Sequence, residues 1–179
     1  FPATTPVTRR SVLLVDSRAG SKELTLPLRK MGLDVEETQL EYGDVAFTGK
    51  GDGGRPVSIG IEFKQLGECV ASLRSERLQG HQLPGMREAY DFSWLLIEGE
   101  LLYDKRGRLL RRAGKREFTP MPGSMGISEY LKRVLVLHLR GGLNPWHTQS
   151  RTDTLKFIEV LYRTWTDCDL DKHQSHLAS

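Results

Sequence analysis

The chain has 179 residues, of which 38% are hydrophobic and 27% charged, and its formal net charge is +3. This length is sufficient for one folded domain that buries a core without disulfides. No apolar run approaches the ~20 residues of a transmembrane helix, and the mildly basic charge permits a polyanionic partner without requiring one.

The two ends of the chain differ from its middle. The first residues are polar and contain prolines rather than a signal peptide, and the start at Phe1 indicates a processed product or a fragment of a larger protein. Cys69 and Cys168 lie far apart with no C-x-x-C motif, which favours a reducing intracellular compartment: the nucleus in a eukaryote, the cytoplasm in a prokaryote or phage. We expect an extension over residues 1–10, a folded domain over 11–166 and a polar tail over 167–179.

A buried strand is predicted over "SVLLVDS", an apolar run with β-branched residues that leads to Asp16 and Arg18. The following "SKELTLPLRKMG" has the apolar spacing of a helix, with Ser21 as the expected N-cap and Gly32 as the end. Pro27 lies inside this pattern and is expected to kink or shorten the helix.

Residues 44–64 predict a β-hairpin. The segments "DVEETQLEYGDVAFTG" and "PVSIGIEFK" are extended in character, and "GKGDGGR" between them is dense in turn-forming residues. A hairpin places the beginning of its first strand beside the end of its second strand.

The remainder of the chain alternates helices with strands. Glu68 to Tyr90 has a helical pattern interrupted at Pro84, "WLLIEGELLY" predicts a strand, and "YDKRGRLL" predicts a turn into a return strand. Helices are expected over 128–141, with Ser128 as a possible cap, and over 150–165, joined by "NPWHTQS" as a short extended link. The order of elements predicts an α/β fold in which helices flank a mixed central sheet.

The second strand of the hairpin carries charged residues on one of its faces. In "SIGIEFKQLGE", Glu62 and Lys64 share one face, whereas Ile61 and Phe63 share the other. An edge strand facing water would explain this pattern through solubility alone. The alternative is an active site.

Asp44 begins the first hairpin strand, so it is expected to converge with Glu62 and Lys64. Two carboxylates suit Mg²⁺, which keeps several waters and shares its shell with phosphate, and Mn²⁺ is expected to substitute for it. Such a metal lowers the pKa of a bound water and neutralises charge on a phosphodiester, while Lys64 can orient that water. The D…E-x-K arrangement is the PD-(D/E)xK nuclease signature, which alone is weak evidence.

Two further acidic residues lie near this pattern. Asp16 ends a buried strand, where a charge is costly unless a partner or a metal offsets it. Glu68 starts the next helix, where a carboxylate can simply favour the positive end of the helix dipole.

Five segments occur in the order and spacing of a known family: "VDSR", "YGDVAF", "IEFKQLGE", "ASLRSERLQGHQLPGM" and "WLLIEGE". They resemble the V-D-x-R-E, G-D, E-R-K-x-x-x-D, R-L-x-x-Q and L-L-I-E motifs in the ERCC4 nuclease domain of the XPF/MUS81/Hef structure-specific endonucleases. The resemblance extends from Val12 to Glu98 and continues more weakly to Trp165. It implies a restriction-endonuclease-like fold for residues 11–166 and cleavage of branched, flap or junction DNA in repair or recombination.

The resemblance also assigns roles to individual residues. Glu68 takes the place of the family's aspartate as a supporting residue, and Gln82 matches the helix glutamine. Two positions depart from the motifs, because Phe63 replaces the arginine of E-R-K and Ala19 replaces the glutamate of V-D-x-R-E. These departures bear on substrate positioning and rate more than on the basic chemistry. The implied catalytic residues are Asp16, Asp44, Glu62 and Lys64, and the implied metal positions are Asp16, Asp44, Glu62 and Phe63.

Basic residues supply candidate DNA contacts. The segment "KRGRLLRRAGKR" contains no acidic residue, and either a solvated loop or a phosphate contact explains it. Arg18 near the site is a further candidate. So are Arg74 and Arg77 on the helix after Lys64, although solvation of a helix surface explains these two equally well. The predicted DNA-binding set is Arg18, Arg74, Arg77, Gln82, Arg111, Arg112, Lys115 and Arg116.

The sequence thus predicts a Mg²⁺-dependent DNA endonuclease domain. One alternative is a non-catalytic DNA-binding or dimerisation module of the same family, although such partners typically lose the acidic residues that are present here. Another is a phage-type nuclease with the same core fold and a different specificity. The apolar helices within residues 128–165 predict a homo- or heterodimer.

Overall fold

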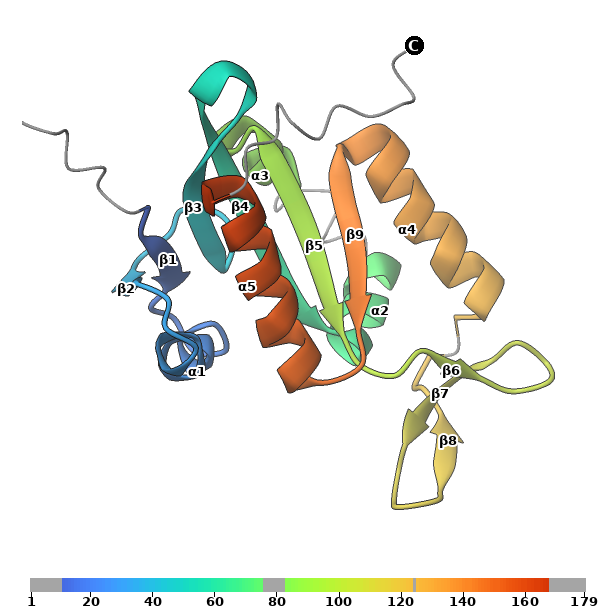
Figure 1. Ribbon diagram of the computed structural model, residues 1–179. Helices are drawn as coiled ribbons and strands as arrows, with labels where there is room; N and C mark the ends of the chain where they lie inside the picture. The colour runs from blue at the N-terminus through green and yellow to red at the C-terminus, as the bar shows by residue number, and fades with distance from the viewer. Residues whose placement is uncertain (1–10, 76–82, 124, 168–179) are drawn as a thin grey trace, which may run out of the picture.

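The protein is described by a computed structural model for residues 11–75, 83–123 and 125–167. Within these ranges, a six-stranded sheet has the order β2-β1-β3-β4-β5-β9, and three short strands form a second sheet in the order β6-β7-β8 (Figure 1). The strands are β1 (Leu13–Asp16), β2 (Val35–Thr38), β3 (Val45–Lys50), β4 (Pro56–Gln65), β5 (Phe92–Glu98), β6 (Leu102–Tyr103), β7 (Leu109–Arg112), β8 (Phe118–Pro120) and β9 (Leu143–Thr148).

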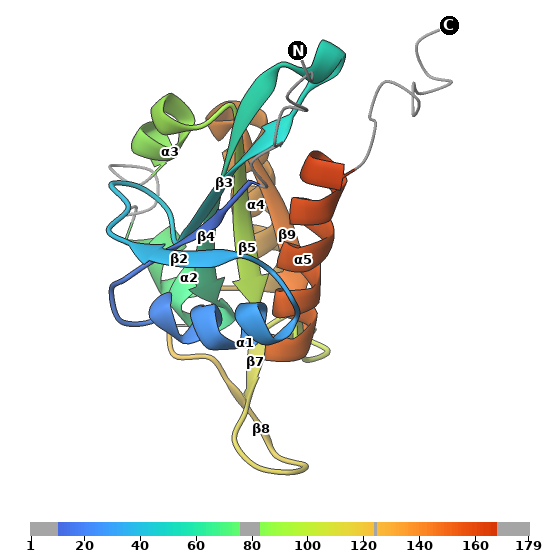
Figure 2. The same ribbon diagram turned by 60° about the vertical axis from the view of Figure 1, so that its left-hand side comes forward.

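Helices cover both faces of the large sheet (Figures 1 and 2). The α-helices are α1 (Thr25–Lys30), α2 (Leu66–Arg74), α3 (Leu83–Ala89), α4 (Ile127–Gly141) and α5 (Arg151–Asp167), and the short 3₁₀ helices are η1 (Lys22–Leu24) and η2 (Asp52–Gly54). None of the helices in the described ranges is long and apolar enough to cross a membrane.

The large sheet is mixed. Strand β3 is antiparallel to β1 and β4, whereas β1 pairs with β2, β4 with β5, and β5 with β9 in parallel. Parallel pairs require crossover connections, which the helices provide. The predicted α/β fold with a mixed central sheet flanked by helices is therefore confirmed.

Two apolar cores lie on opposite faces of the sheet. The first packs α1 and α5 against residues such as Val15, Ile61 and Leu96, and the second packs α2 and α4 against residues such as Leu95 and Ile97. Alternation along β5 therefore assigns each strand residue to one core. Glu62 and Lys64 pair in register with Leu95 and Ile97, which places them on the face covered by α2.

The hairpin is formed as predicted. Strands β3 and β4 pair from Val45 opposite Ile61 to Lys50 opposite Pro56. The turn between them contains η2, in which Gly53 adopts a φ of 63°, a conformation that favours glycine.

The structure corrects three local predictions. The segment expected as a link contributes most of β9, and Pro145 is accommodated there because an edge strand pairs on one side only. Ser128 is not the cap of α4, since the helix already begins at Ile127 after Gly126. Ser21 makes no side-chain capping hydrogen bond.

Pro27 falls in the first turn of the short helix α1, where its missing N–H costs little.

Candidate active site

Backbone pairing brings the ends of three strands together. The N–H of Asp16 donates to the carbonyl of Asp44 at 2.8 Å, and the N–H of Asp44 donates to the carbonyl of Ile61 at 2.8 Å. Asp16, Asp44 and Glu62 are consequently neighbours across β1, β3 and β4. Together with Lys64 they form what we call the strand-end cluster.

The side chains of the cluster point away from the first core. Val15, Val45 and Ile61 are fully buried in that core, and strand alternation directs the adjacent Asp16, Asp44 and Glu62 to the opposite face. Asp16 is only 2% exposed and Glu62 only 6% exposed. Burial of charge at this density is costly unless other groups compensate it.

Asp44 is held through both of its carboxylate oxygens. The N–H of Phe63 donates to Oδ2 at 2.7 Å, and the hydroxyl of Ser21 donates to Oδ1. Burial raises the pKa of Asp44, although these two hydrogen bonds and the charge of Lys64 act in the opposite direction.

Glu62 forms an ion pair with Lys64, with Oε1 2.9 Å from Nζ. Burial raises the pKa of Glu62, and the negative charge of Asp44 raises it further, against the opposing effect of Lys64. The two carboxylates therefore repel each other in a partly desolvated environment.

Asp16 is engaged by groups of the protein itself. Its Oδ2 accepts from Nε of Arg18 at 2.5 Å, and its Oδ1 accepts from the N–H of Leu40 at 3.1 Å. Arg18 also donates to the carbonyl of Leu40 at 2.8 Å, which closes the loop after β2 onto the end of β1. Arg18, predicted as a DNA contact, thus has a partner inside the site.

The oxygen donors of the cluster bear on whether it can hold a metal ion. Across the described ranges, no three His, Cys, Asp or Glu side chains form a group that could hold one. Asp44 and Glu62 nevertheless provide two mutually repelling carboxylates, which a divalent cation would stabilise. The carbonyl of Phe63 lies on the same strand edge as its N–H, which reaches Asp44, so this edge also offers a neutral oxygen. The residues present fit a hard cation that keeps several waters.

Tyr90 completes the wall of the site and was not predicted. Its ring packs over Gly60, where an added Cβ would lie 2.2 Å from Tyr90 Cδ2, and its hydroxyl donates to the carbonyl of Tyr42 at 2.6 Å. Burial and the charges of Asp16 and Glu62 raise the pKa of Tyr90. The sequence signal for this contact is Gly60, which shares a strand face with Glu62 and Lys64 and leaves room there for a large side chain.

A second polar network lies at the end of β5 and was also missed. Glu98 accepts hydrogen bonds from Gln65 at 2.8 Å, Thr154 at 2.7 Å and Arg151 at 3.0 Å. Burial opposes ionisation of Glu98, yet these hydrogen bonds lower its pKa overall. The guanidinium of Arg151 also lies 5.3 Å from the ring centroid of Phe63. The guanidinium of Arg151 from α5 therefore lies beside Phe63, the residue at the position of the arginine in the E-R-K motif.

The predicted residues around α2 are on the surface. Glu68 is exposed in the first turn of α2. Arg74, at the end of the same helix, lies against Gly123, where an added Cβ would be 1.6 Å from its Nη1. Arg77 and Gln82 fall outside the described residues.

The predicted basic segment contains β7, the central strand of the small sheet, which projects beyond the end of the large sheet where β4 and β5 end (Figure 1). Arg112 is used within this sheet, because it pairs with Glu100 at 2.7 Å and lies 5.0 Å from the ring centroid of Phe118. Three other predicted basic residues are exposed and make no ion pair with any described residue. These are Arg111, Lys115 and Arg116, and we refer to them as the basic sheet residues.

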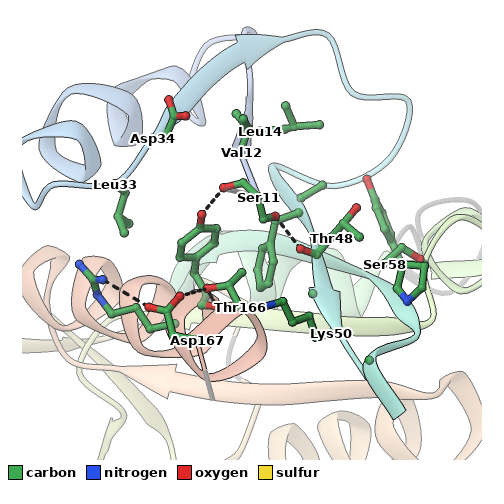
Figure 3. A pocket seen from close by; sticks show the side chains of 18 of the residues that line it. Ser11, Val12, Leu14, Leu33, Asp34, Thr48, Lys50, Ser58, Thr166 and Asp167 are labelled. Atoms are coloured by element: carbon green, nitrogen blue, oxygen red, sulfur yellow. Dashed lines mark hydrogen bonds and ion pairs between the residues drawn. The ribbon is translucent and has the colours of Figure 1, made fainter. Parts of the chain in front are cut away.

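A large pocket of about 1,100 Å³, shown in Figure 3, has Tyr90 among the residues that line it. It is bordered by Ser11 at the start of β1, by Thr48 and Lys50 of β3, and by Thr166 and Asp167 of α5. None of the four predicted catalytic residues lines it. The candidate chemistry therefore lies at the strand ends rather than in this pocket.

Known proteins place the chain in a family. The sequence profile of the ERCC4 domain matches residues 15–161, whereas no curated protein matches the chain. XPF from Aeropyrum pernix in complex with DNA is structurally similar, with a TM-score of 0.62, 22% sequence identity, and coverage of 86% of this chain and 64% of that chain. A further structure of XPF from Aeropyrum pernix has a TM-score of 0.63, 22% identity, and coverage of 91% of this chain and 69% of that chain.

These structures share the fold of this chain, which spans just under two thirds of the DNA-bound protein. The profile match includes all four residues of the strand-end cluster and covers most of the sequence. The chain belongs to the ERCC4 domain family.

Proposed function

We propose that residues 11–166 form a metal-dependent endonuclease domain that hydrolyses phosphodiester bonds in DNA. The observation that carries this proposal is the half-buried carboxylate of Asp44 and the buried carboxylate of Glu62, which repel each other beside Lys64. Ordinary structural ion pairs balance their charges, whereas here desolvation by burial raises the pKa of both carboxylates despite the lysine, and the charge of Asp44 raises that of Glu62 further. Such an arrangement is typical of functional sites.

Asp44, Glu62 and the carbonyl of Phe63 would hold Mg²⁺, with Mn²⁺ as a substitute. When bound, the ion supplies a water of lowered pKa and neutralises charge on the phosphate. Asp16 remains a proposed catalytic residue and metal position, because its oxygens, which accept from Arg18 and Leu40, can also accept from a further direction. It borders the two carboxylates that would bind the ion.

Lys64 would act on the reacting phosphate. Its ammonium lies 2.9 Å from Glu62, on the face of β4 that also carries the carboxylates. A fixed cation there stabilises the charge that develops on phosphate oxygens and orients the attacking water. The exposed Glu68 would support the site from the first turn of α2.

Branched, flap or junction DNA is the proposed substrate. XPF from Aeropyrum pernix, which has the same fold, has been solved in complex with DNA. The small sheet lies beyond the ends of β4 and β5 (Figure 1), and Arg74 lies against Gly123. This supports the basic sheet residues and Arg74 as proposed contacts for phosphates flanking the cleaved bond. Arg77 and Gln82 remain proposed contacts from the sequence motif.

The wild-type chain should nick a labelled flap or junction faster than a linear duplex of the same sequence in Mg²⁺, and should be inactive in EDTA. If it binds the branched DNA but cleaves nothing with Mg²⁺ or Mn²⁺, it is the non-catalytic module of the family. Cleavage without preference for branches would instead support a nuclease of different specificity on the same core.

We also propose that the domain pairs with a second subunit of the same fold, either another copy or a relative, through residues 128–165. Leu131, Leu135 and Leu139 of α4 are 43%, 56% and 75% exposed, and β9 beside them is an open sheet edge. Apolar stripes of this kind mark interfaces. Light scattering at tens of micromolar tests the homodimer, and a strict monomer there would leave only pairing with a different chain.

A further inference from the structure

Ser21 is a buried polar residue that does not perform its expected task. It is 4% exposed and precedes η1, where the sequence predicts a helix cap. A capping residue requires extended backbone, whereas Ser21 has φ −80° and ψ −42°, which is helical. Its hydroxyl consequently makes no capping hydrogen bond.

The hydroxyl reaches Asp44 instead. It donates to Oδ1, while the N–H of Phe63 donates to Oδ2 at 2.7 Å. These two donors come from different segments of the chain, so together they fix both the position and the plane of the carboxylate. Hydrogen bonds to an ionised acceptor are shorter and stronger than those between neutral groups.

The backbone around Ser21 holds this donor in place. The N–H of Leu24 donates to the carbonyl of Ser21 at 2.9 Å, and Leu24 itself is fully buried in the first core. The N–H of Lys22 donates to the carbonyl of Arg18 at 3.2 Å. Gly20 has a φ of 98°, which permits the turn that directs Ser21 inward.

We infer that Ser21 is a positioning residue, whose hydroxyl orients the Asp44 carboxylate to receive the metal ion of the proposed nuclease. A carboxylate oxygen accepts from more than one direction, so Oδ1 can bind the cation while it accepts from Ser21. Groups that orient a metal ligand in this way contribute to metal affinity and to rate. This inference rests on the proposed function.

The test compares three variants with wild type, all assayed below their unfolding temperatures. Ser21→Ala should weaken Mn²⁺ binding, measured by calorimetry without DNA, and lower kcat by about 10- to 100-fold each, with KM for DNA unchanged. Ser21→Thr keeps a hydroxyl and should recover most of both losses. Ser17→Ala, at an exposed serine of the same loop, should match wild type.

Equal Mn²⁺ affinity and kcat in Ser21→Ala and wild type would overturn the inference while leaving the proposed function intact. A change in KM alone would make Ser21 a DNA contact, which also contradicts it. If Ser21→Thr unfolds at the wild-type temperature but has the Mn²⁺ affinity and kcat of Ser21→Ala, the hydroxyl does not orient Asp44, and the inference is wrong. A wild-type chain that neither binds Mn²⁺ nor cleaves would refute the proposed function, and this inference with it.

Discussion

The strand-end cluster and the small basic sheet differ in how firmly the fold fixes the positions of their side chains. Asp16 and Glu62 of the cluster are buried and Asp44 and Lys64 are half-buried, and hydrogen bonds from backbone and side-chain donors hold the carboxylates. The basic sheet residues are exposed and form no ion pair with the part of the chain that the structure describes. Chemistry requires fixed geometry, whereas attraction of a polyanion requires only charge in the right region.

This contrast predicts two separable kinds of variant. Changes in the cluster should alter the rate of cleavage without loss of DNA binding. Changes in the basic sheet should alter DNA binding and its dependence on salt, without an effect on the rate at saturating DNA.

The largest effect is expected from Asp44→Asn and Glu62→Gln. Each removes one charged oxygen ligand from the proposed ion, so single-turnover cleavage should fall by at least about 100-fold. DNA binding should be equal or tighter, because negative charge near the phosphate is removed. Asp34→Asn and Glu36→Gln alter exposed carboxylates and serve as matched controls. A variant of the cluster that keeps the wild-type rate would remove that carboxylate from the mechanism.

A smaller effect is expected from neutralising the basic sheet residues. Arg111→Gln, Lys115→Gln and Arg116→Gln together should weaken binding to all DNA sequences, because fewer counterions are released. The slope of log K against log salt should become shallower by about 0.9 for each phosphate that the variant no longer neutralises. Fluorescence anisotropy across a salt series measures this slope.

The control for that series is the pair Lys156→Gln and Arg163→Gln on α5, where both residues pair with Glu159. The control removes positive charge from a different face of the protein. An unchanged slope in the basic sheet variant would assign that sheet a role in solubility.

Local sequence patterns were sufficient to predict the hairpin and the convergence of Asp44 with Glu62 and Lys64. The period of two and the turn residues of "GKGDGGR" determine which residues face each other across β3 and β4. The mixed sheet followed from the order of elements, since parallel pairs need helical crossovers.

The partners of the site residues could not be predicted in the same way. Ser21 contacts Asp44 across 23 residues, and Thr154 contacts Glu98 across 56, so neither pair leaves a local pattern. The sequence favours an N-cap at Ser21 because serine is among the residues preferred at the N-cap position of a helix. The tertiary hydrogen bond to the half-buried carboxylate of Asp44 outweighs that local preference here.

The smallest effect concerns stability, and it tests the central claim that Asp44 and Glu62 form a cation site. Their folded pKa values are raised above the unfolded values of 3.8 and 4.5. Stability from these groups is therefore fully present below the unfolded pKa values, and it is lost as pH rises through the folded ones. Glu98 has a lowered pKa and the opposite dependence, which is why a variant is compared with wild type.

The decisive measurement is the unfolding temperature of wild type and Glu62→Gln across pH, in EDTA and in Mg²⁺. In EDTA at pH 7 the variant should be the more stable protein, by about 2–4 °C for each kcal/mol of relieved desolvation and repulsion, and the difference should vanish near pH 4. Mg²⁺ should stabilise wild type at pH 7 and the variant much less. Identical curves for the two proteins, with no response of wild type to Mg²⁺ at any pH, would contradict a cation site at these carboxylates.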